Sequence, residues 1–165
     1  MDRMVRMGEL AISNTDGDVL VSLGLGSCIG LAVVDRRARA AGLAHIVLPE
    51  TTGRPAPETL HKFADQSVPA LLDGLIALGG TRIFMQAFVV GGASMFAGVS
   101  GLDVGSRNAV AVRELLAAQR IPVTAEDVGG SKGRTIRVDV ASGGVRVREA
   151  GGQTRELGSA MAVTA

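Results

Sequence analysis

Short apolar runs separated by glycine-rich or charged turns occupy the first third of the chain. The runs at residues 19–23, 27–34 and 43–48 are apolar at most positions. Strands covered on both faces carry such continuous runs, whereas strands with one face in solvent alternate between apolar and polar side chains. The pattern therefore predicts three buried strands, preceded by a short strand at residues 10–13 and followed by a proline-containing loop at residues 49–58.

Helical spacing occurs twice in the middle of the chain. Between residues 60 and 78, apolar side chains recur at intervals of three and four, as on one face of an amphipathic helix. Pro69 falls inside this pattern and cannot donate a backbone hydrogen bond, so we expect a kink there or a second helix that begins near it. Another helix is predicted after Ser106, whose hydroxyl can cap its first turn.

Strand patterns return on either side of this second helix. Residues 83–90 are a largely apolar run of strand length, and residues 121–128 are also predicted to form a strand. Near the end of the chain, Ile136 and Val138 alternate with polar residues ahead of a glycine-containing turn. This alternation predicts a hairpin over residues 135–148 with one buried face.

The chain has 165 residues, enough for one domain with a substantial core. It contains no internal repeat or interdomain linker, so we expect a single domain over residues 1–150 and a flexible tail over residues 151–165. One charge-free stretch, residues 83–102, has the length of a membrane span. Its four glycines and its polar residues favour a strand followed by a turn, and we expect no insertion into a membrane.

Composition narrows the possible functions. Seventeen basic and sixteen acidic residues leave a net charge of +1, and the chain has no Trp or Tyr and only four Phe. A general nucleic-acid binder needs a basic face and stacking aromatic rings, so no nucleic-acid partner is expected. The single cysteine excludes an internal disulfide, and the first residues lack an apolar signal segment. Both features predict a reducing, cytoplasmic location.

The single cysteine, Cys28, lies in the glycine-rich turn Gly-Leu-Gly-Ser-Cys, and His45 lies on the next apolar segment. A thiol is only a few per cent ionised near pH 7, and a neighbouring imidazole can take its proton. The pair therefore fits a thiol nucleophile with its base, and we expect this thiol to react faster than a free one. The alternative is a small buried hydrophobic residue, the usual environment of a free cysteine. The residues alone leave both interpretations open.

Other candidate groups give weaker signals. Ser22 lies in the strand that leads to the turn, where it is either the hydroxyl that orients the imidazole or an ordinary strand serine. The two histidines and the cysteine have no close metal-ligand spacing, so no metal site is predicted. The glycine-rich stretches at residues 24–30 and 129–134 lack the pattern of a nucleotide-binding loop, so no cofactor is predicted.

Six short stretches together resemble the CheD family, the chemoreceptor glutamine deamidases of bacterial and archaeal chemotaxis. They occur in the family's order: Leu-Gly-Leu-Gly-Ser-Cys at 23–28, Ala-His-Ile-Val-Leu-Pro at 44–49, Gly-Gly-Ala-Ser-Met-Phe at 91–96, Gly-Ser-Arg-Asn at 105–108, Ala-Glu-Asp-Val-Gly-Gly at 125–130 and Gly-Arg at 133–134. No single stretch is decisive, but the ordered set is specific.

The resemblance implies an α/β (α+β) fold with layered mixed β-sheets and helices packed on the outside. It implies that Cys28 is the nucleophile and His45 its base, and that Ser22 replaces a threonine of the family while keeping the hydroxyl. Backbone amides of the turn, at Gly26, Ser27 and Cys28 itself, are the expected oxyanion donors. The implied activity is that of a protein-glutamine glutaminase, which hydrolyses receptor glutamine side chains to glutamate through a thioester.

The resemblance also implies partners. These are the cytoplasmic helices of methyl-accepting chemotaxis receptors and a CheC-type phosphatase that acts on phosphorylated CheY. We expect the loops at residues 49–58 and 91–105 to contact the receptor, without assigning individual substrate-binding residues. Two alternatives remain: a non-catalytic module that regulates a CheC-type partner, and a transglutaminase-like acyl transferase in which an amine resolves the thioester.

Overall fold

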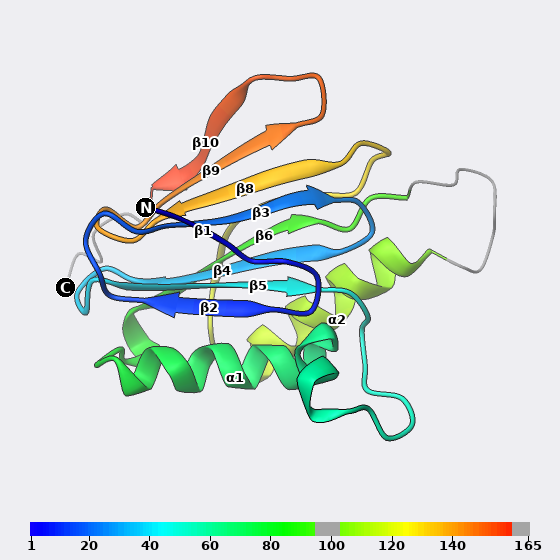
Figure 1. Ribbon diagram of the computed structural model, residues 1–165, viewed down its shortest axis with the longest axis horizontal. Coiled ribbons are helices and arrows are strands. Elements are labelled where there is room, and N and C mark those ends of the chain that lie inside the picture. Colours follow the sequence, from blue (N-terminus) through cyan, green and yellow to red (C-terminus); the bar gives the residue numbers. More distant parts are fainter. Residues whose placement is uncertain (95–102, 160–165) are drawn as a thin grey trace.

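Two five-stranded sheets lie face to face, and two helices cover the outer face of one of them (Figure 1). The computed structural model describes residues 1–94 and 103–159. The first sheet has the strand order β1 (Asp2–Met4), β3 (Val19–Leu25), β8 (Arg134–Asp139), β9 (Gly144–Glu149) and β10 (Thr154–Ser159). The second has the order β2 (Leu10–Ser13), β5 (Ala40–Ile46), β4 (Ile29–Asp35), β6 (Met85–Gly91) and β7 (Val123–Val128).

Each sheet is mixed, because the pairs β1–β3 and β6–β7 are parallel while the other pairs are antiparallel. The helical elements are η1 (Pro57–Lys62), α1 (Ala64–Ala77), η2 (Arg82–Phe84) and α2 (Val104–Ala118). Both long helices pack on the second sheet, so the layers run helix, sheet, sheet. The predicted α+β class with layered mixed sheets and external helices is confirmed.

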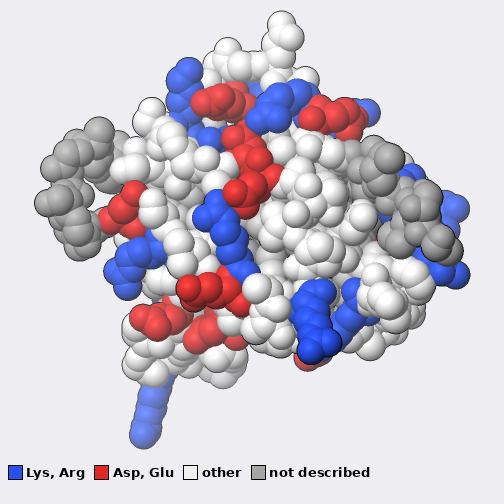
Figure 2. All heavy atoms as spheres, turned by 180° about the vertical axis from the view of Figure 1, so that it is seen from behind, with Lys and Arg blue, Asp and Glu red and all other residues white. Residues whose placement is uncertain are grey.

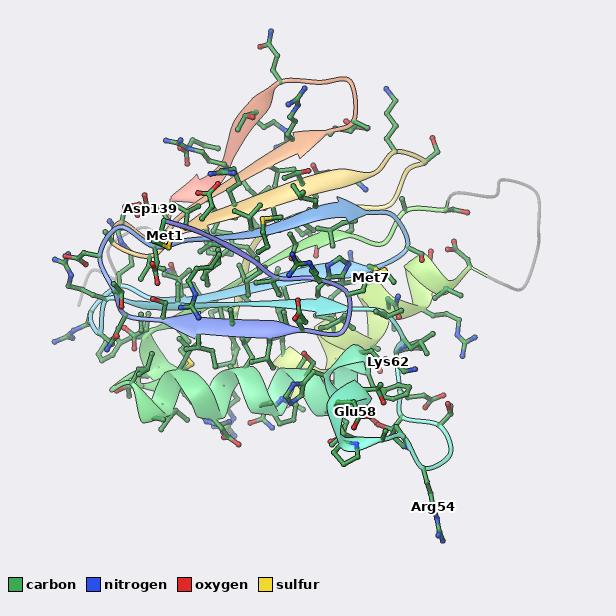
Figure 3. The ribbon with its side chains drawn as sticks, in the orientation of Figure 1. Met1, Met7, Arg54, Glu58, Lys62 and Asp139 are labelled. Carbon is green, nitrogen blue, oxygen red and sulfur yellow. The ribbon has the colours of Figure 1, made fainter. Side chains whose placement is uncertain are left out.

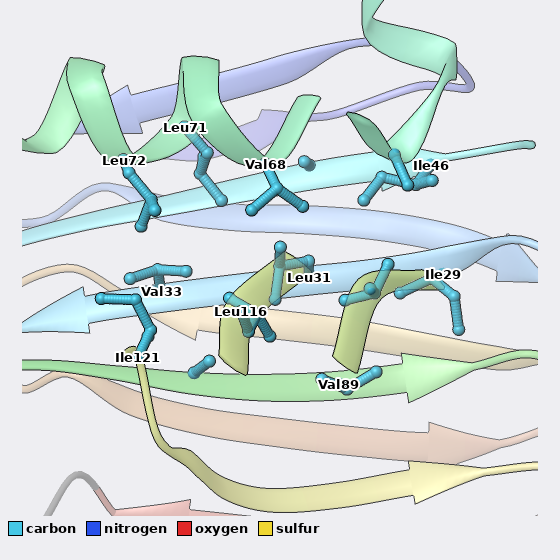
Figure 4. Close-up of a cluster of buried hydrophobic side chains, with 14 of the residues drawn as sticks. Ile29, Leu31, Val33, Ile46, Val68, Leu71, Leu72, Val89, Leu116 and Ile121 are labelled. Atoms are coloured by element: carbon cyan, nitrogen blue, oxygen red, sulfur yellow. The ribbon is translucent and has the colours of Figure 1, made fainter. Parts of the chain in front are cut away.

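The second sheet is the central layer, which explains its continuous apolar runs. Every residue of β4 and of β5 is buried. Ile29, Leu31 and Val33 belong to the core beneath the helices, whereas Ala32 and Val34 belong to the core between the sheets. Figure 4 shows the helix-side core, where α1 and α2 pack against the central strands. Each fully buried aliphatic side chain contributes roughly 1.5–3 kcal/mol to the free energy of folding, so the two hydrophobic cores on either side of this sheet supply most of the stabilisation.

The first sheet has one face in solvent and alternates accordingly. In the β8–β9 hairpin, Ile136 and Val138 are buried against the second sheet, as predicted. Arg137 and Arg146 stand opposite each other on the outward face, where each pairs with a carboxylate. On the side of the molecule shown in Figure 2, basic side chains are likewise interspersed with acidic ones.

The helices begin at other positions than the sequence predicts. Pro69 lies inside a single helix, α1, and does not begin a new one. The cap of α2 is Asp103, whose carboxylate accepts from the backbone N–H of Ser106 at 3.1 Å, so the prediction of Ser106 as the cap is wrong. Asp and Ser are both good caps, and the helical spacing does not distinguish between positions three residues apart.

The chain continues as sheet where a tail was expected. β10 pairs antiparallel with β9, so residues 154–159 form an edge strand rather than part of a flexible tail. Its sequence is almost wholly polar, which hides the strand pattern. Residues 160–165 lie outside the described residues. None of the described helices has the length and hydropathy to cross a membrane. The charge-free stretch starts in η2 and continues as strand β6, and its residues 95–102 are not described.

Candidate active site

Cys28 lies where the chain passes from the first sheet to the second. β3 ends at Leu25 and β4 begins at Ile29, so Gly26, Ser27 and Cys28 form the whole connection. Cys28 is 9% exposed and packs in the apolar layer between the sheets. The thiol is therefore at the edge of the covered layer, at one end of the sandwich.

The backbone of this connection is anchored through its carbonyl oxygens. Its three carbonyls accept, in chain order, from the N–H of Ala93, the side-chain amide of Asn108 and the N–H of Gly92, at 2.8–2.9 Å. The donors come from the segment after β6 and from α2, so two other parts of the chain fix the shape of the turn.

The N–H groups of the connection, those of Gly26, Ser27 and Cys28, have no acceptor in the part of the chain that the structure describes. In a planar trans peptide the C=O and N–H bonds point in opposite directions, so anchoring the Gly26 and Ser27 carbonyls turns the next N–H groups away from their anchors. Free, fixed N–H groups beside a nucleophile are what an oxyanion hole requires.

Two glycines, the last residue of β6 and the residue after it, allow the close approach of these segments. Gly91 has φ +113° and Gly92 has φ +61°, in the left-handed region that favours glycine. A Cβ atom on Gly91 would lie 2.2 Å from the Cys28 carbonyl oxygen. A Cβ atom on Gly105, in the first turn of α2, would lie within 2.6 Å of the Gly92 and Ala93 carbonyl oxygens. The backbone segments at Cys28, at Gly91–Ala93 and at Gly105 therefore pack so closely that no side chain fits between them.

His45 projects from β5 into the layer between the sheets. Its partner on β4 is Gly30, and Cys28 precedes Gly30 by two residues, so thiol and imidazole lie diagonally on one face of the sheet. Diagonal neighbours on one sheet face lie about 7–8 Å apart, with somewhat shorter distances between their Cβ atoms. The register therefore places the predicted nucleophile and base on one face at the same end of the sandwich, and no hydrogen bond joins the thiol to Nε2 among the described residues.

The ring of His45 is fixed by a backbone carbonyl. Nδ1 lies 3.2 Å from the carbonyl oxygen of Val5. A carbonyl can only accept, so Nδ1 carries the proton and Nε2 carries the lone pair. Nε2 is buried and has no hydrogen-bond partner among the described residues. The nitrogen that can take a proton is thus the free one.

Ser22 acts on this carbonyl rather than on the ring. It projects from β3 of the first sheet, is fully buried, and donates its hydroxyl to the Val5 oxygen at 2.8 Å. Ser22 and His45 therefore converge on one acceptor from opposite sheets. Sequence reasoning named Ser22 as the direct partner of His45; the direct partner in the structure is Val5, and a backbone oxygen carries no side-chain signal.

Burial sets the charge state of the pair. It raises the pKa of the Cys28 thiol above its usual 9.0. It also lowers the pKa of His45 below its usual 6.5, against smaller opposing effects of the Val5 hydrogen bond and the Glu9 charge. At pH 7 the resting pair is therefore a thiol and a neutral imidazole. This differs from the reactive thiolate expected from sequence, because both side chains are withdrawn from water.

Two buried side chains near the turn were not singled out from the sequence. Asn108 of α2 is fully buried and donates to the carbonyls of Ser27 and Val47, both at 2.9 Å. Arg134 of β8 is also buried; it donates to the Gly91 carbonyl and pairs with Asp127 at 3.3 Å. Both occur in the stretches that resemble the family, but the backbone carbonyls that they contact are distant in sequence and carry no pattern.

A groove lies beside this end of the sandwich. It has a volume of about 560 Å³ and is lined by Pro49 and Glu50 of the loop after β5 and by Arg107, Val110 and other residues of α2. Figure 3 shows Met7 and Lys62 near one another beside the ends of the strands. Of the second loop expected to contact a receptor, residues 95–102 lie outside the described residues.

The described residues bring no three His, Cys, Asp or Glu side chains together as a metal site.

Known proteins resemble this chain over most of its length. A family model described as CheD chemotactic sensory transduction matches residues 47–149. A Clostridium kluyveri protein named "Probable chemoreceptor glutamine deamidase CheD" is 40% identical over 153 residues, which cover 90% of this chain and 94% of that protein. A Clostridium botulinum protein of the same name, from strain Alaska E43, is 40% identical over 89% of this chain and 92% of its own length.

A solved structure, that of the Neisseria meningitidis protein NMB0706, is a distant likeness. It is 15% identical, has a TM-score of 0.42, and the match covers 74% of this chain and 52% of that one, which is too distant to bear on the site. The family model and the two relatives establish the family without this structure. By the match to more than half of its residues and by 40% identity across 90% of its length, the chain belongs to the CheD family.

Proposed function

We propose that this protein hydrolyses glutamine side-chain amides of chemoreceptors, with Cys28 as the nucleophile and His45 as the base. The observation that carries the proposal is the buried Nε2 of His45, which lacks a partner among the described residues while Nδ1 is held. A buried acceptor left unpaired typically costs about 1–3 kcal/mol, so this nitrogen, on the same sheet face as the thiol, fits a base awaiting a proton. The names of the relatives support the reaction.

The first half of the reaction forms a thioester. As the Cys28 sulfur attacks the amide carbon, His45 Nε2 takes the thiol proton, so the neutral resting pair becomes charged only during attack. The carbonyl oxygen gains the negative charge and is stabilised by the free N–H groups of Ser27 and Cys28. His45 then passes its proton to the amide nitrogen, ammonia leaves, and the glutamyl group remains on sulfur.

The second half hydrolyses the thioester. His45, neutral again, takes a proton from water as the water oxygen attacks the thioester carbon. The same N–H groups stabilise the second oxyanion. The thiolate of Cys28 then leaves and recovers the proton from His45, which releases glutamate and restores the thiol.

The proposed substrate is a protein surface, not free glutamine. Cys28 is only 9% exposed at the end of the sandwich, and the neighbouring groove borders the loop after β5 and α2. A receptor helix supplies contacts over a broad area, and their binding energy positions one side chain against the thiol. A substrate on receptor cytoplasmic helices supports a cytoplasmic location for the protein. A CheC-type phosphatase as a further partner rests on the family resemblance alone.

The decisive experiment is mass spectrometry of a receptor cytoplasmic fragment incubated with the protein. We expect specific glutamines to become glutamates with release of ammonia, and no conversion with Cys28→Ala. Free glutamine and a short glutamine peptide, run in parallel, should be converted far less efficiently. A wild-type protein that converts no receptor glutamine would overturn the proposal, and equal efficiency on all three substrates would indicate a small-molecule amidase.

A further inference from the structure

Asn108 joins the segment that carries the nucleophile to the segment that follows the base. Its Nδ2 donates to the carbonyl of Ser27, the residue before Cys28, and to that of Val47, two residues after His45. Both partners can only accept, so the NH₂ group of the amide must face them and its orientation is fixed by chemistry. Both of its N–H bonds are used, each across a separation of more than sixty residues.

This arrangement is not explained by the stability of α2. Asparagine is a poor residue for a helix interior. Asn108 is fully buried, and its Oδ1 has no hydrogen-bond partner among the described residues, which adds a desolvation cost. A buried apolar residue would suit the helix better. Asn108 is therefore better explained by the carbonyl groups of Ser27 and Val47 that its side-chain amide holds in place.

The carbonyl of Ser27 and the N–H of Cys28 belong to the same peptide. Because that peptide is planar and trans, fixing the carbonyl direction fixes the N–H direction opposite to it. We propose that Asn108 is a positioning residue that aims the Cys28 N–H at the developing oxyanion and ties the turn to the strand of His45. This inference rests on the proposed Cys28 chemistry and extends it to a residue that touches no substrate.

The other side of Cys28 is held separately. Its own carbonyl accepts from the N–H of Gly92 at 2.9 Å, and strand β4 begins at the next residue. Loss of Asn108 therefore frees the Ser27–Cys28 peptide while the thiol keeps its attachment to the sheet. The expected defect is selective: reactions that build an oxyanion suffer, and a reaction of the thiol without one does not.

The test compares two reagents on the full-length protein. p-Nitrophenyl acetate acylates Cys28 through a tetrahedral oxyanion, whereas iodoacetamide alkylates the same sulfur by direct displacement and forms none. The variants are Asn108→Asp, which keeps the shape of the side chain, and Asn108→Ala, which removes the amide. The control is Val112→Ala, one turn further along α2, where the side chain is buried in the helix-side core.

We expect acylation to slow by about 100-fold in both Asn108 variants, the order found when one oxyanion donor is lost, with alkylation unchanged. Val112→Ala should lower thermal stability and leave the ratio of the two rates as in the wild type. Equal slowing of both reactions, or acylation no slower than in Val112→Ala, would overturn the proposal. Receptor deamidation is measured separately. If the wild-type protein deamidates no receptor, the proposed function is wrong, but the ratio of the acylation and alkylation rates still tests the role of Asn108.

Discussion

The two ends of the β4–β5 hairpin hold buried polar groups in opposite conditions. At the turn end, Asp35 is 1% exposed, and its carboxylate accepts from the backbone N–H groups of Arg37, Ala38 and Thr81 at 2.8–3.0 Å. At the open end, His45 is 3% exposed and keeps one ring nitrogen without a partner among the described residues. The two groups lie on the same pair of strands and are buried to a similar degree, but only the carboxylate of Asp35 has hydrogen-bond donors for both of its oxygens.

This difference separates a structural group from a chemical one. A buried acceptor with three donors fixes the loop around it and leaves nothing available for a ligand. A buried acceptor with no donor is unfavourable for the fold and is available for a proton from outside. For these two groups, the presence or absence of hydrogen-bond donors is therefore a better guide to the proposed reactive site than the degree of burial. Four predictions test this comparison.

The largest effect is expected at the open end. Cys28→Ala should lower turnover on receptor glutamines by on the order of 10⁴-fold or more, as the loss of a nucleophile does. Its thermal midpoint should stay near that of the wild type, because one small buried residue replaces another. Ammonia release and thermal unfolding by circular dichroism measure the two quantities. Near-normal turnover by the folded variant would remove Cys28 from the mechanism.

At the turn end the effect should fall on stability. Asp35→Ala leaves three buried N–H groups without their acceptor and should lower the free energy of unfolding by roughly 3 kcal/mol. Turnover per folded molecule should be unchanged. Urea unfolding gives the first value and activity at low temperature the second. Asp16→Ala, which removes only an exposed ion pair with Arg39, is the matched control and should lower the free energy of unfolding far less. Loss of turnover in folded Asp35→Ala would break the contrast between the two ends.

Ser22 should have an intermediate effect, because it reaches the ring only through the Val5 carbonyl. Ser22→Ala should lower kcat by about tenfold, below the 10²–10⁴-fold typical of a lost general base. Ser22→Thr keeps the hydroxyl and should retain activity. Steady-state kinetics of the two variants measure whether the hydroxyl matters. Full activity in Ser22→Ala would leave a Cys-His pair oriented by the carbonyl alone.

The smallest effects concern pH. Burial lowers the pKa of His45 and raises that of Cys28, so kcat/KM should stay level from below pH 6.5 to above pH 9.0. For stability, the depressed pKa of His45 gives a contribution that is complete above the unfolded value of 6.5 and is lost as pH falls through the folded value. His45→Gln should flatten this acid limb in urea unfolding. An activity limb between pH 6.5 and pH 9.0 would contradict a neutral resting pair.

The class of fold and the candidate chemistry follow from local patterns in the sequence. Continuous apolar runs identified β4 and β5 of the central layer, and the alternation of Ile136 and Val138 identified a sheet with one face in solvent. These are local patterns, and burial imposes them directly on neighbouring residues. The run at residues 19–23 was wrongly expected to be covered on both faces, because it belongs to β3 of the first sheet, where Leu23 is exposed.

Cys28 was singled out because it is the only thiol and follows a glycine-rich turn, and His45 because the next apolar segment carries an imidazole. The polar strand β10 and the cap at Asp103 were missed, since neither carries a strong local pattern.

The surroundings of these groups depend on contacts that form only in the folded chain. The Val5 carbonyl that orients His45 is forty residues away in sequence, and the amide of Asn108 reaches Ser27 across eighty-one. A backbone oxygen is present at every residue, so nothing in the sequence marks the one that a histidine uses. The charge state of the Cys28–His45 pair was decided in the same way. It depends on how much water the two stacked sheets exclude, which is a property of the packed layers and not of the residues alone.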